Sequence, residues 1–308
     1  MKRQLFLFIF ILFLVSITNA TWRVVSTENS DVPYELVKLI DTAESTVLLV
    51  AYSLDLDRII ESLNDAVERG VFVEAIVDDS SVTRTLSKKP KFKLLTDSSS
   101  ALIHAKFLLV DNSFLVFGTG NFSQSGLVDD SNVFIITDNE EIVQAFTEIY
   151  SAVISGNNYF DVFQSIEIYL TPAPESKKRV IEELTNAKDE ILFLSYAFTD
   201  PEILSVLKLK SAQGIEVKGV IDSWNKNSSP VFKWVTTGMR VRVNPNEWRV
   251  HDKIIIIDRK TAIFGSANLT LSAWERNREI IVIIELKEIV DRLINHFNYI
   301  WEVCSNDS

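Results

Sequence analysis

The sequence contains little cysteine, glycine and proline, and it has fewer basic than acidic residues. Its single cysteine, Cys304, allows neither an intrachain disulfide nor a thiolate metal cluster. Nine glycines and seven prolines, beside a hydrophobic fraction of 47%, exclude collagen-like, low-complexity and disordered proteins. The net charge of −11 argues against capture of polyanions by bulk attraction, although it leaves room for a local basic site. The length of 308 residues then suggests two domains or one large one.

The longest apolar run lies at the N-terminus. Lys2 and Arg3 precede an apolar stretch from Leu5 to Ile17, and small or polar residues follow up to Ala20. This order is typical of a secretory signal peptide, and the stretch is shorter than the roughly 20 residues that span a bilayer as a helix. We therefore expect a signal peptide over residues 1–20 and a secreted or extracytoplasmic protein. An uncleaved signal anchor is the alternative.

The rest of the chain is an internal repeat. Residues Ser45–Asp79 and Asp189–Asp222 each hold an apolar run that ends at a tyrosine, an amphipathic stretch that ends at a glycine, and a second apolar run that ends at an aspartate. The two tyrosines, Tyr52 and Tyr196, are 144 positions apart, as are the glycines and the aspartates. The pattern predicts a strand, a helix and a second, parallel strand in each copy, which is a βαβ unit.

A second block repeats more strictly, at an offset of 147. The matched residues are His104 and His251, Lys106 and Lys253, Asp111 and Asp258, Gly118 and Gly265, Thr119 and Ser266, and Asn121 and Asn268. An apolar strand and an amphipathic helix close each copy. We expect two halves, residues 21–155 and 166–308, joined by a linker over residues 156–165 into one body.

The duplicated histidines and lysines favour a functional site over a core position. In a strand, residues two apart point to the same face, so each histidine and its lysine point together. A strand in the core gains nothing from this arrangement, because burying an unpaired ammonium group is costly. We interpret the third histidine, His296 in the last predicted helix, as an ordinary core residue.

The doubled motif H-x-K-x4-D-x6-G-[ST]-x-N resembles that of the phospholipase D superfamily of phosphodiesterases. Its two copies read HAK…D…GTGN from His104 and HDK…D…GSAN from His251, and the resemblance extends over both halves. It implies an α/β fold of two α/β/α sandwich halves related by a pseudo-two-fold axis. We expect mixed, mainly parallel sheets and one active site between the halves.

Phosphodiester cleavage needs a nucleophile, an acid for the leaving oxygen, and positive donors for the other phosphate oxygens. Two imidazoles can fill the first two roles near neutral pH. The resemblance implies His104 as the nucleophile that forms a covalent phosphohistidine, and His251 as the general acid and base. The expected phosphate ligands are Lys106, Lys253, Asn121 and Asn268, assisted by Thr119 and Ser266, whereas Asp111 and Asp258 are expected to support the motifs structurally. We expect no cofactor and no metal, because the two lysines supply the positive charge.

A carboxylate is expected to orient each imidazole. The family carries a glutamate about eleven residues after the motif asparagine, and Glu279 matches it. The first half has no glutamate at this place, and Asp129 and Asp130 are the nearest acids. The two histidines therefore need not have the same surroundings.

A basic stretch precedes each motif. The first contains Arg84, Lys88, Lys89, Lys91 and Lys93, and the second contains Lys233, Arg240, Arg242 and Arg249. They are either solvated surface charges or a positive mouth of the site. Trp224, Phe232, Trp234 and Trp248 lie within the second stretch, and such a mixture suits a lipid–water interface or stacking on unpaired bases.

Three functions remain open. The favoured one is a secreted phospholipase D-type enzyme that cleaves or transfers phospholipid head-group esters, with contact to a membrane surface. The alternatives are an extracytoplasmic endonuclease with the same two-histidine mechanism, and a catalytically silent module that binds lipid surfaces. Intact motifs in both halves argue against the silent module, and the negative net charge disfavours a nucleic acid substrate.

Overall fold

The structure, a computed structural model, describes residues 20–97 and 101–305. The expected signal peptide, apart from Ala20, lies outside this range. Within it, none of the helices combines the length and the apolar character that a membrane crossing requires.

The first half is built on a seven-stranded sheet with the order β1-β7-β6-β5-β2-β3-β4. Its strands are β1 (Trp22–Ser26), β2 (Thr46–Ala51), β3 (Phe72–Val77), β4 (Lys93–Leu95), β5 (Phe107–Val110), β6 (Phe114–Gly118) and β7 (Val133–Thr137). The helices α1 (Val32–Asp41) and α2 (Asp57–Glu68) pack on one face and α4 (Glu140–Ser155) on the other, and the short turns α3 (Val82–Ser87) and η1 (Ser125–Asp129) lie in the connections. Helices on both faces give the expected α/β/α sandwich.

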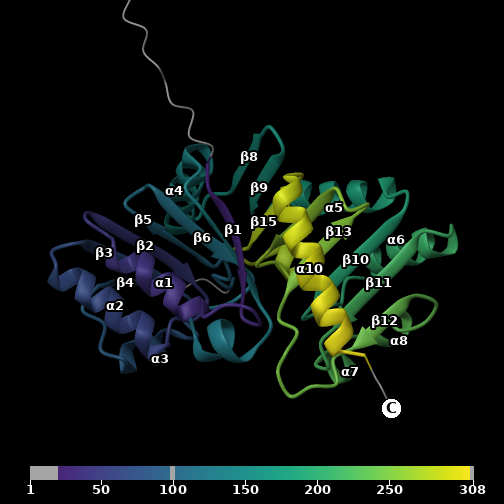
Figure 1. Cartoon of the computed structure of the whole chain (residues 1–308), viewed down its shortest axis with the longest axis horizontal. Helices are drawn as coiled ribbons and strands as arrows, with labels where there is room; N and C mark the ends of the chain where they lie inside the picture. Colours follow the sequence, from purple (N-terminus) through teal and green to yellow (C-terminus); the bar gives the residue numbers. More distant parts are fainter. Residues whose placement is uncertain (1–19, 98–100, 306–308) are drawn as a thin grey trace, which may run out of the picture.

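The second half repeats this plan around an eight-stranded sheet with the order β12-β11-β10-β13-β14-β15-β9-β8. Its strands are β8 (Tyr159–Phe163), β9 (Ile166–Leu170), β10 (Glu190–Ser195), β11 (Glu216–Ile221), β12 (Arg240–Val243), β13 (Lys253–Ile257), β14 (Thr261–Gly265) and β15 (Ile280–Ile284). Its helices are α5 (Pro174–Asn186), α6 (Pro201–Ala212), α7 (Asn225–Ser228), α8 (Phe232–Val235), α9 (Leu271–Glu275) and α10 (Lys287–Val303). The two halves lie side by side, with α10 beside β1 at the boundary (Figure 1).

The mixed sheets confirm the expected fold class, but the expected excess of parallel pairs is wrong. Only β2-β3-β4 and β10-β11-β12 run parallel, and every other neighbouring pair is antiparallel. The strands that carry the motifs are joined by three-residue turns at 111–113 and 258–260, in which Asp111 and Asp258 adopt left-handed φ angles of 53° and 52°. Such short connections cannot make the crossover that parallel pairing requires.

Residues 156–165 do more than link the halves. Gly156 ends α4 with a left-handed φ of 72°, a conformation that glycine adopts without a steric penalty. The chain then forms β8, which pairs antiparallel with β9 at the edge of the second sheet. The segment that was expected as a linker therefore adds an eighth strand to the second half.

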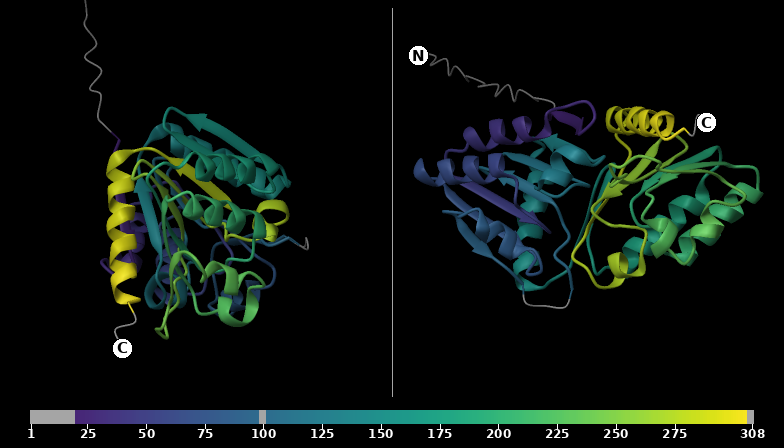
Figure 2. Two further views of the ribbon diagram at one scale, coloured as in Figure 1. Left: turned by 90° about the vertical axis from the view of Figure 1, so that its right-hand side faces the viewer. Right: turned by 90° about the horizontal axis from the view of Figure 1, so that it is seen from below.

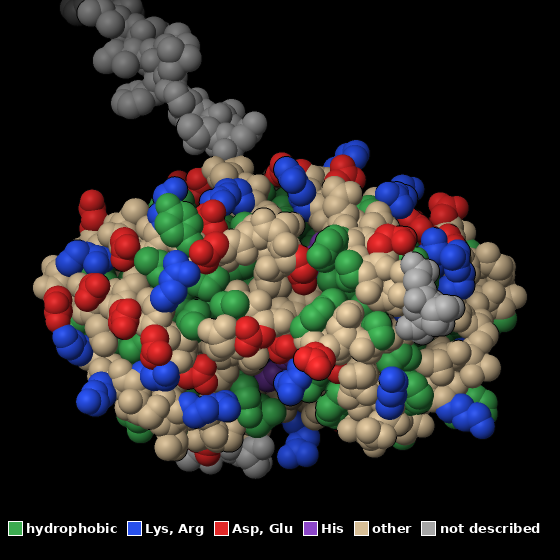
Figure 3. All heavy atoms as spheres, turned by 60° about the horizontal axis from the view of Figure 1, so that its bottom comes forward, with side chains coloured by type: hydrophobic (Ala, Val, Ile, Leu, Met, Phe, Trp, Pro, Cys, Tyr) green, Lys and Arg blue, Asp and Glu red, His purple; other side chains and the backbone are tan. Residues whose placement is uncertain are grey.

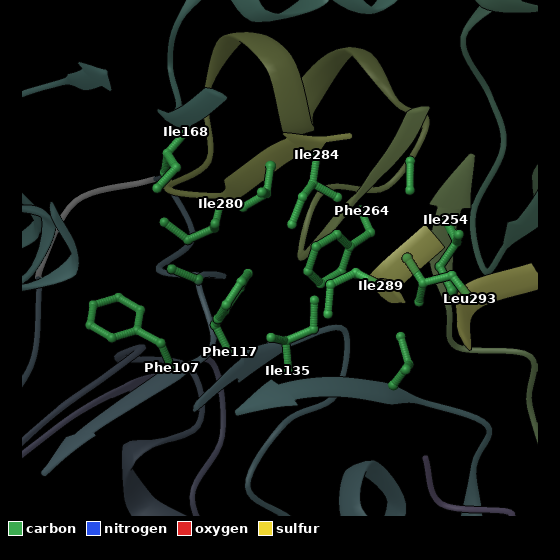
Figure 4. Close-up of a cluster of buried hydrophobic side chains, with 14 of the residues drawn as sticks. Phe107, Phe117, Ile135, Ile168, Ile254, Phe264, Ile280, Ile284, Ile289 and Leu293 are labelled. Atoms are coloured by element: carbon green, nitrogen blue, oxygen red, sulfur yellow. The ribbon is translucent and has the colours of Figure 1, made fainter. Parts of the chain in front are cut away.

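The two halves share one hydrophobic core. The inner faces of both sheets, together with α4 and α10, form a single cluster of buried side chains (Figure 4). Phe117 of β6 and Phe264 of β14, which are equivalent in the repeat, meet with their ring centroids 5.3 Å apart. Because this apolar surface leaves water only when the halves are joined, they form one body, as the views in Figure 2 also show.

Candidate active site

Both motifs begin at the carboxyl ends of the parallel strands. Asp78 follows β3, and its Oδ2 accepts a hydrogen bond of 2.8 Å from the backbone N–H of Ile103. Asp222 follows β11, and its Oδ2 accepts one of 3.0 Å from the backbone N–H of Val250. Each aspartate thus fixes the residue before a motif histidine at the end of a strand.

Reciprocal backbone bridges then join the halves at this end. The N–H of His104 donates to the carbonyl of Arg278 at 2.9 Å, and the N–H of His251 donates to the carbonyl of Ser131 at 3.1 Å. Ser131 and Arg278 are themselves equivalent in the repeat. His104 therefore lies beside Glu279, which follows Arg278, and His251 lies beside Asn132, which follows Ser131.

His104 is paired with a carboxylate of the second half. Its Nδ1 lies 2.7 Å from Oε2 of Glu279, and the same oxygen accepts a 2.7 Å hydrogen bond from the Ser266 hydroxyl. The Glu279 side chain is fully buried, and that of His104 is 12% exposed. With Nδ1 committed to Glu279, the Nε2 atom of a neutral His104 carries the free lone pair that a nucleophile needs.

His251 has a neutral partner from the first half. Its Nδ1 lies 3.0 Å from Oδ1 of Asn132, and this oxygen also accepts a 2.9 Å hydrogen bond from the Thr119 hydroxyl. Asn132 is the repeat equivalent of Glu279. The nearest acids in the sequence, Asp129 and Asp130, are not hydrogen-bond partners of His251, because Asp129 binds Gln124 and Asp130 accepts from the backbone N–H of Arg249.

Asn132 is a site residue that a search for acids misses. The signal that finds it is the offset of 147, which maps Glu279 onto position 132 whatever residue stands there.

The two imidazoles have lowered pKa values. Burial lowers the pKa of His104, although the charge of Glu279 opposes this effect. Burial also lowers the pKa of His251, well below the ordinary value, and the charges of Lys253 and Lys106 lower it further. Glu279 stays ionised, because His104 and Lys106 lower its pKa in spite of burial. In the free site both imidazoles are therefore mainly neutral near pH 7.

The motif lysines lie buried beside the histidines. Each Nζ donates a hydrogen bond to the backbone carbonyl of the histidine in its own motif. Burial lowers the pKa of Lys106 well below its ordinary value, and burial lowers that of Lys253 to about 7 although Asp252 and Glu279 oppose the shift. Two lysines and two mainly neutral imidazoles thus surround one carboxylate, so the site has an excess of positive charge when both lysines are protonated. A phosphodiester anion would balance this excess.

Asn121 and Asn268 follow β6 and β14. Their buried Oδ1 atoms have no hydrogen-bond partner among the described residues. An unpaired buried amide is costly, and such a group at a site is typical of a ligand contact. An amide oxygen only accepts hydrogen bonds, so the unpaired Oδ1 atoms call for a donor, and the expected contacts to phosphate oxygens would be made by the Nδ2 groups of the two amides.

Thr119 and Ser266 were expected to assist at the phosphate, but their hydroxyls bind the partners of the two histidines. Both are fully buried, and each hydroxyl donates its proton to the partner of a histidine, Asn132 or Glu279. Each also accepts from a backbone N–H, that of Val133 or Ile280. The hydroxyls are therefore committed to orienting Asn132 and Glu279.

Asp111 and Asp258 lie at the far ends of the motif strands. Asp111 accepts hydrogen bonds from the backbone N–H groups of Glu44, Ser45 and Thr46, and Asp258 from those of Lys188, Asp189 and Glu190. Despite partial burial, these donors lower the pKa of both carboxyls. Both aspartates thus tie the motif hairpin to the start of the neighbouring strand, β2 or β10.

Comparison with known proteins identifies the family. The family model described as "Cardiolipin synthase, PLD-like domain" matches residues 36–154 and again residues 180–301. The chain therefore belongs to the phospholipase D superfamily. The two matches coincide with the two halves, so the superfamily domain is present in two copies.

Individual relatives in the superfamily are distant. The chain is 25% identical over 146 residues to a phospholipase D of Rickettsia prowazekii, which is 46% of this chain and 71% of the relative. It is 29% identical over 135 residues to the mitochondrial cardiolipin hydrolase of Mus musculus, which is 43% of this chain and 61% of the relative. The phosphatidylserine synthase of Haemophilus influenzae has the same fold, with a TM-score of 0.68 at 10% identity, over 91% of this chain and 86% of that one.

The first basic stretch of this phospholipase D-family chain is largely neutralised. Its ion pairs are Arg84 with Asp55, Lys88 with Asp57, Lys91 with Glu68, and Lys93 with Glu74. In the second stretch Arg240 pairs with Glu216, and Arg242 stacks on Trp301 and donates to its carbonyl. Figure 3 shows basic and acidic side chains interspersed over the face that it presents. Most of the predicted positive mouth is therefore paired surface charge.

Aromatic rings line the site on the side of the second half. The ring of Tyr196 lies 4.9 Å from that of His251 and 5.7 Å from that of Trp224. The Arg249 guanidinium, from the second basic stretch, lies 6.0 Å from the Tyr196 ring. The first half has Tyr52, whose ring lies 5.6 Å from that of His104 and whose hydroxyl accepts from Ser80. A tyrosine thus lies beside each histidine, and the side of the second half adds a tryptophan and an arginine.

The third histidine is buried behind the second motif. Nε2 of His296 lies 3.0 Å from Oδ1 of Asp252, and Nδ1 lies 3.6 Å from Glu28 of the first half. Asp252 also accepts a hydrogen bond from Ser131. Burial opposes a charge on His296, but the two carboxylates raise its pKa above the ordinary value. His296 is therefore a core residue, as interpreted, and it also holds the two halves together by charge.

The described residues hold no group of three or more His, Cys, Asp or Glu side chains arranged to bind a metal ion.

Proposed function

We propose that this phospholipase D-superfamily phosphodiesterase cleaves the head-group ester of phospholipids through a covalent phosphohistidine on His104. The observation that carries the proposal is the unequal pairing at one site, His104 with Glu279 and His251 with Asn132. A carboxylate beside His104 stabilises the positive charge that its ring gains when Nε2 bonds to phosphorus. A neutral amide beside His251 leaves that ring free to exchange its proton in both steps.

The first step breaks the bond between phosphorus and the leaving alcohol. Nε2 of His104 attacks phosphorus, and His251 donates a proton to the leaving oxygen. The negative charge of the bound diester raises the pKa of His251, so that it carries this proton when substrate is present. Lys106, Lys253, Asn121 and Asn268 hold the phosphate oxygens.

The second step releases the product. His251, now neutral, takes a proton from water, and the hydroxide attacks phosphorus and breaks its bond to Nε2 of His104. The products are a phosphate monoester and the free alcohol, and the enzyme returns to its starting state. An alcohol in place of water gives transfer instead of hydrolysis.

Two observations favour a phospholipid over a nucleic acid. Most of the cations that could hold a polyanion are paired with acids, and the chain is acidic overall. The relatives include a phospholipase D and a cardiolipin hydrolase. We also propose that the enzyme acts outside the cytoplasm, and the order of residues in the N-terminal segment supports this location.

The test is incubation of the purified protein with phosphatidylcholine, phosphatidylglycerol, cardiolipin and single-stranded DNA, without added metal. We expect release of a head-group alcohol with formation of phosphatidic acid, and a sample quenched in alkaline SDS is expected to carry a phosphatidyl group on His104. The matched control is His104→Asn, which should do neither. Rapid cleavage of DNA with inert lipids would overturn the lipid substrate. The metal-free mechanism would be overturned if EDTA abolished the activity and a divalent metal restored it.

A further inference from the structure

We propose that residues Trp224–Val235, which contain α7 and α8 and are called the docking segment below, bind the protein to an anionic lipid surface. The proposal rests on the proposed function, because it concerns how the same site meets a substrate that lies in a membrane or vesicle.

The docking segment is continuous with the catalytic site. It begins two residues after Asp222, whose carboxylate fixes the start of the second motif. The ring of Trp224 contacts that of Tyr196, which in turn contacts His251. In Figure 1, α7 and α8 lie at the same end of the molecule as α3, which follows β3 of the first half. Contact through this segment would place the site against the surface.

The docking segment lies in a local excess of positive charge. The sequence between Asp222 and Glu247 contains no acidic residue, although the whole chain carries −11. The ion pairs nearby use Lys218 and Arg240. Lys226 and Lys233 form no ion pair within residues 20–97 and 101–305, so their charges remain available to anionic lipid head groups.

Two exposed tryptophans accompany these lysines, and Trp224 is the less exposed of the two at 37%. Trp234 is 56% exposed on α8, whereas Val231 and Val235 are buried in the core beneath it. Nζ of Lys208 lies 5.2 Å from the Trp234 ring. Tryptophan next to lysine, held on a helix whose other face is buried, is typical of residues at a lipid–water interface.

The corresponding stretch of the first half lacks these features. Four of its five basic side chains are paired with acids. Single-stranded nucleic acid is bound along a groove of many cations with interleaved rings. Two lysines without an ion pair and two exposed tryptophans on one side of the site match a lipid surface better than such a groove.

The test measures sedimentation of the His104→Asn protein with unilamellar vesicles, since this variant cannot consume them. We expect binding to phosphatidylglycerol vesicles and weak binding to phosphatidylcholine vesicles at about 0.1 M salt. Replacing both Lys226 and Lys233 by serine should lower the partition coefficient about 30-fold. Trp234→Ala should lower it about tenfold.

Matched controls lie at the opposite end of the sheets. Lys188→Ser with Lys260→Ser removes two exposed lysines that, like Lys226 and Lys233, form no ion pair among the described residues, and Phe72→Ala removes an exposed ring. Both controls should bind as the parent does. The same docking substitutions should also be made in protein that keeps His104. These variants should hydrolyse soluble bis(p-nitrophenyl) phosphate at the unchanged rate, which would show that they are folded.

The outcomes separate this proposal from the lipid substrate. If the docking variants bound vesicles as well as the parent does, the role of the docking segment would be overturned even if lipids are hydrolysed. The same would follow if the controls lost as much vesicle binding as the docking variants. Lysine-dependent binding of single-stranded DNA in place of vesicles would also overturn it. Lysine-dependent vesicle binding without lipid hydrolysis would support the docking segment and reject the lipid substrate.

Discussion

The two halves hold the same motif in the same local geometry, yet three pairs of equivalent residues around it differ in charge. In the repeat, Asn132 corresponds to Glu279, Ala105 to Asp252, and Ile149 to His296. The first pair contacts the histidines, and the other two lie behind the motifs in the core. The two halves therefore carry identical histidines and lysines in their motifs, while the residues that support these side chains differ in charge. The predictions below test how much of the chemistry follows from this difference.

The largest effect is expected from the histidines themselves. His104→Asn and His251→Asn should each lower kcat for a phospholipid at least about 10⁴-fold. The two should differ with bis(p-nitrophenyl) phosphate, whose leaving group needs no acid. His251→Asn should then accumulate a p-nitrophenyl phosphoryl group on His104, and His104→Asn should not. Mass spectrometry of protein quenched in alkaline denaturant would show this, because a phosphorus–nitrogen bond is labile in acid. An adduct on His251 would reverse the assigned roles.

The next effect concerns the partners of the imidazoles. Glu279→Gln should lower kcat about 10³-fold, because the positive charge on His104 in the intermediate loses its counter-charge. Asn132→Asp should keep most of the activity and raise the pKa of His251, since a carboxylate favours the protonated ring. The alkaline limb of the profile of kcat/KM against pH should therefore move to higher pH. Equal losses in the two variants would show that the halves are functionally symmetric.

The buried charges behind the second motif can be compared with their apolar equivalents. His296→Ala should lower the free energy of unfolding by about 3–5 kcal/mol, because it leaves the Asp252 carboxylate buried without its partner. The double variant Asp252→Ala with His296→Ile copies the first half and should cost less than either single change. Urea unfolding followed by fluorescence measures each value, and a double variant less stable than both singles would contradict the account.

This charge pair also gives stability a pH dependence of known sign. Although burial opposes it, the pKa of His296 is raised in the folded protein. Its stabilising contribution is fully present below the unfolded pKa of about 6.5 and is lost as the pH rises through the folded pKa. The wild-type protein should therefore lose its advantage over the double variant as the pH is raised.

The smallest effect is expected from the titration of a lysine. Burial lowers the pKa of Lys253 to about 7, so this group loses its charge in the free enzyme as the pH rises above neutrality. The inhibition constant of inorganic phosphate should rise by up to about fivefold between pH 7 and 8. Lys253→Arg, which stays charged, should remove this dependence. A flat profile in the natural enzyme would contradict the lowered pKa.

The repeat makes most of the fold and the motif residues predictable. Its two constant offsets identify equivalent residues without any knowledge of the fold, and the glycine after each amphipathic stretch marks the end of a helix. The pairing of the sheets is less accessible, because the parallel βαβ units are only part of each half. The short turns at Asp111 and Asp258 are the signal that the remaining strands are antiparallel.

Contacts between distant parts of the chain explain what sequence reasoning misses. Lys91 and Lys93 are neutralised by Glu68 and Glu74, which belong to α2 and β3 and precede them by about twenty residues. Asn132 and Glu279 each serve the histidine of the other half, and this exchange depends on the bridges at Ser131 and Arg278. Such partners become visible only when the topology is known.

The exchange of partners across the halves has an evolutionary consequence. In a symmetric pair of identical chains, one position would supply the partner of both histidines, so a mutation there would alter both at once. In this duplicated chain positions 132 and 279 are separate codons, and each can change without the other. The duplication therefore allows selection to change the surroundings of one histidine without changing those of the other, which is what the two proposed roles require.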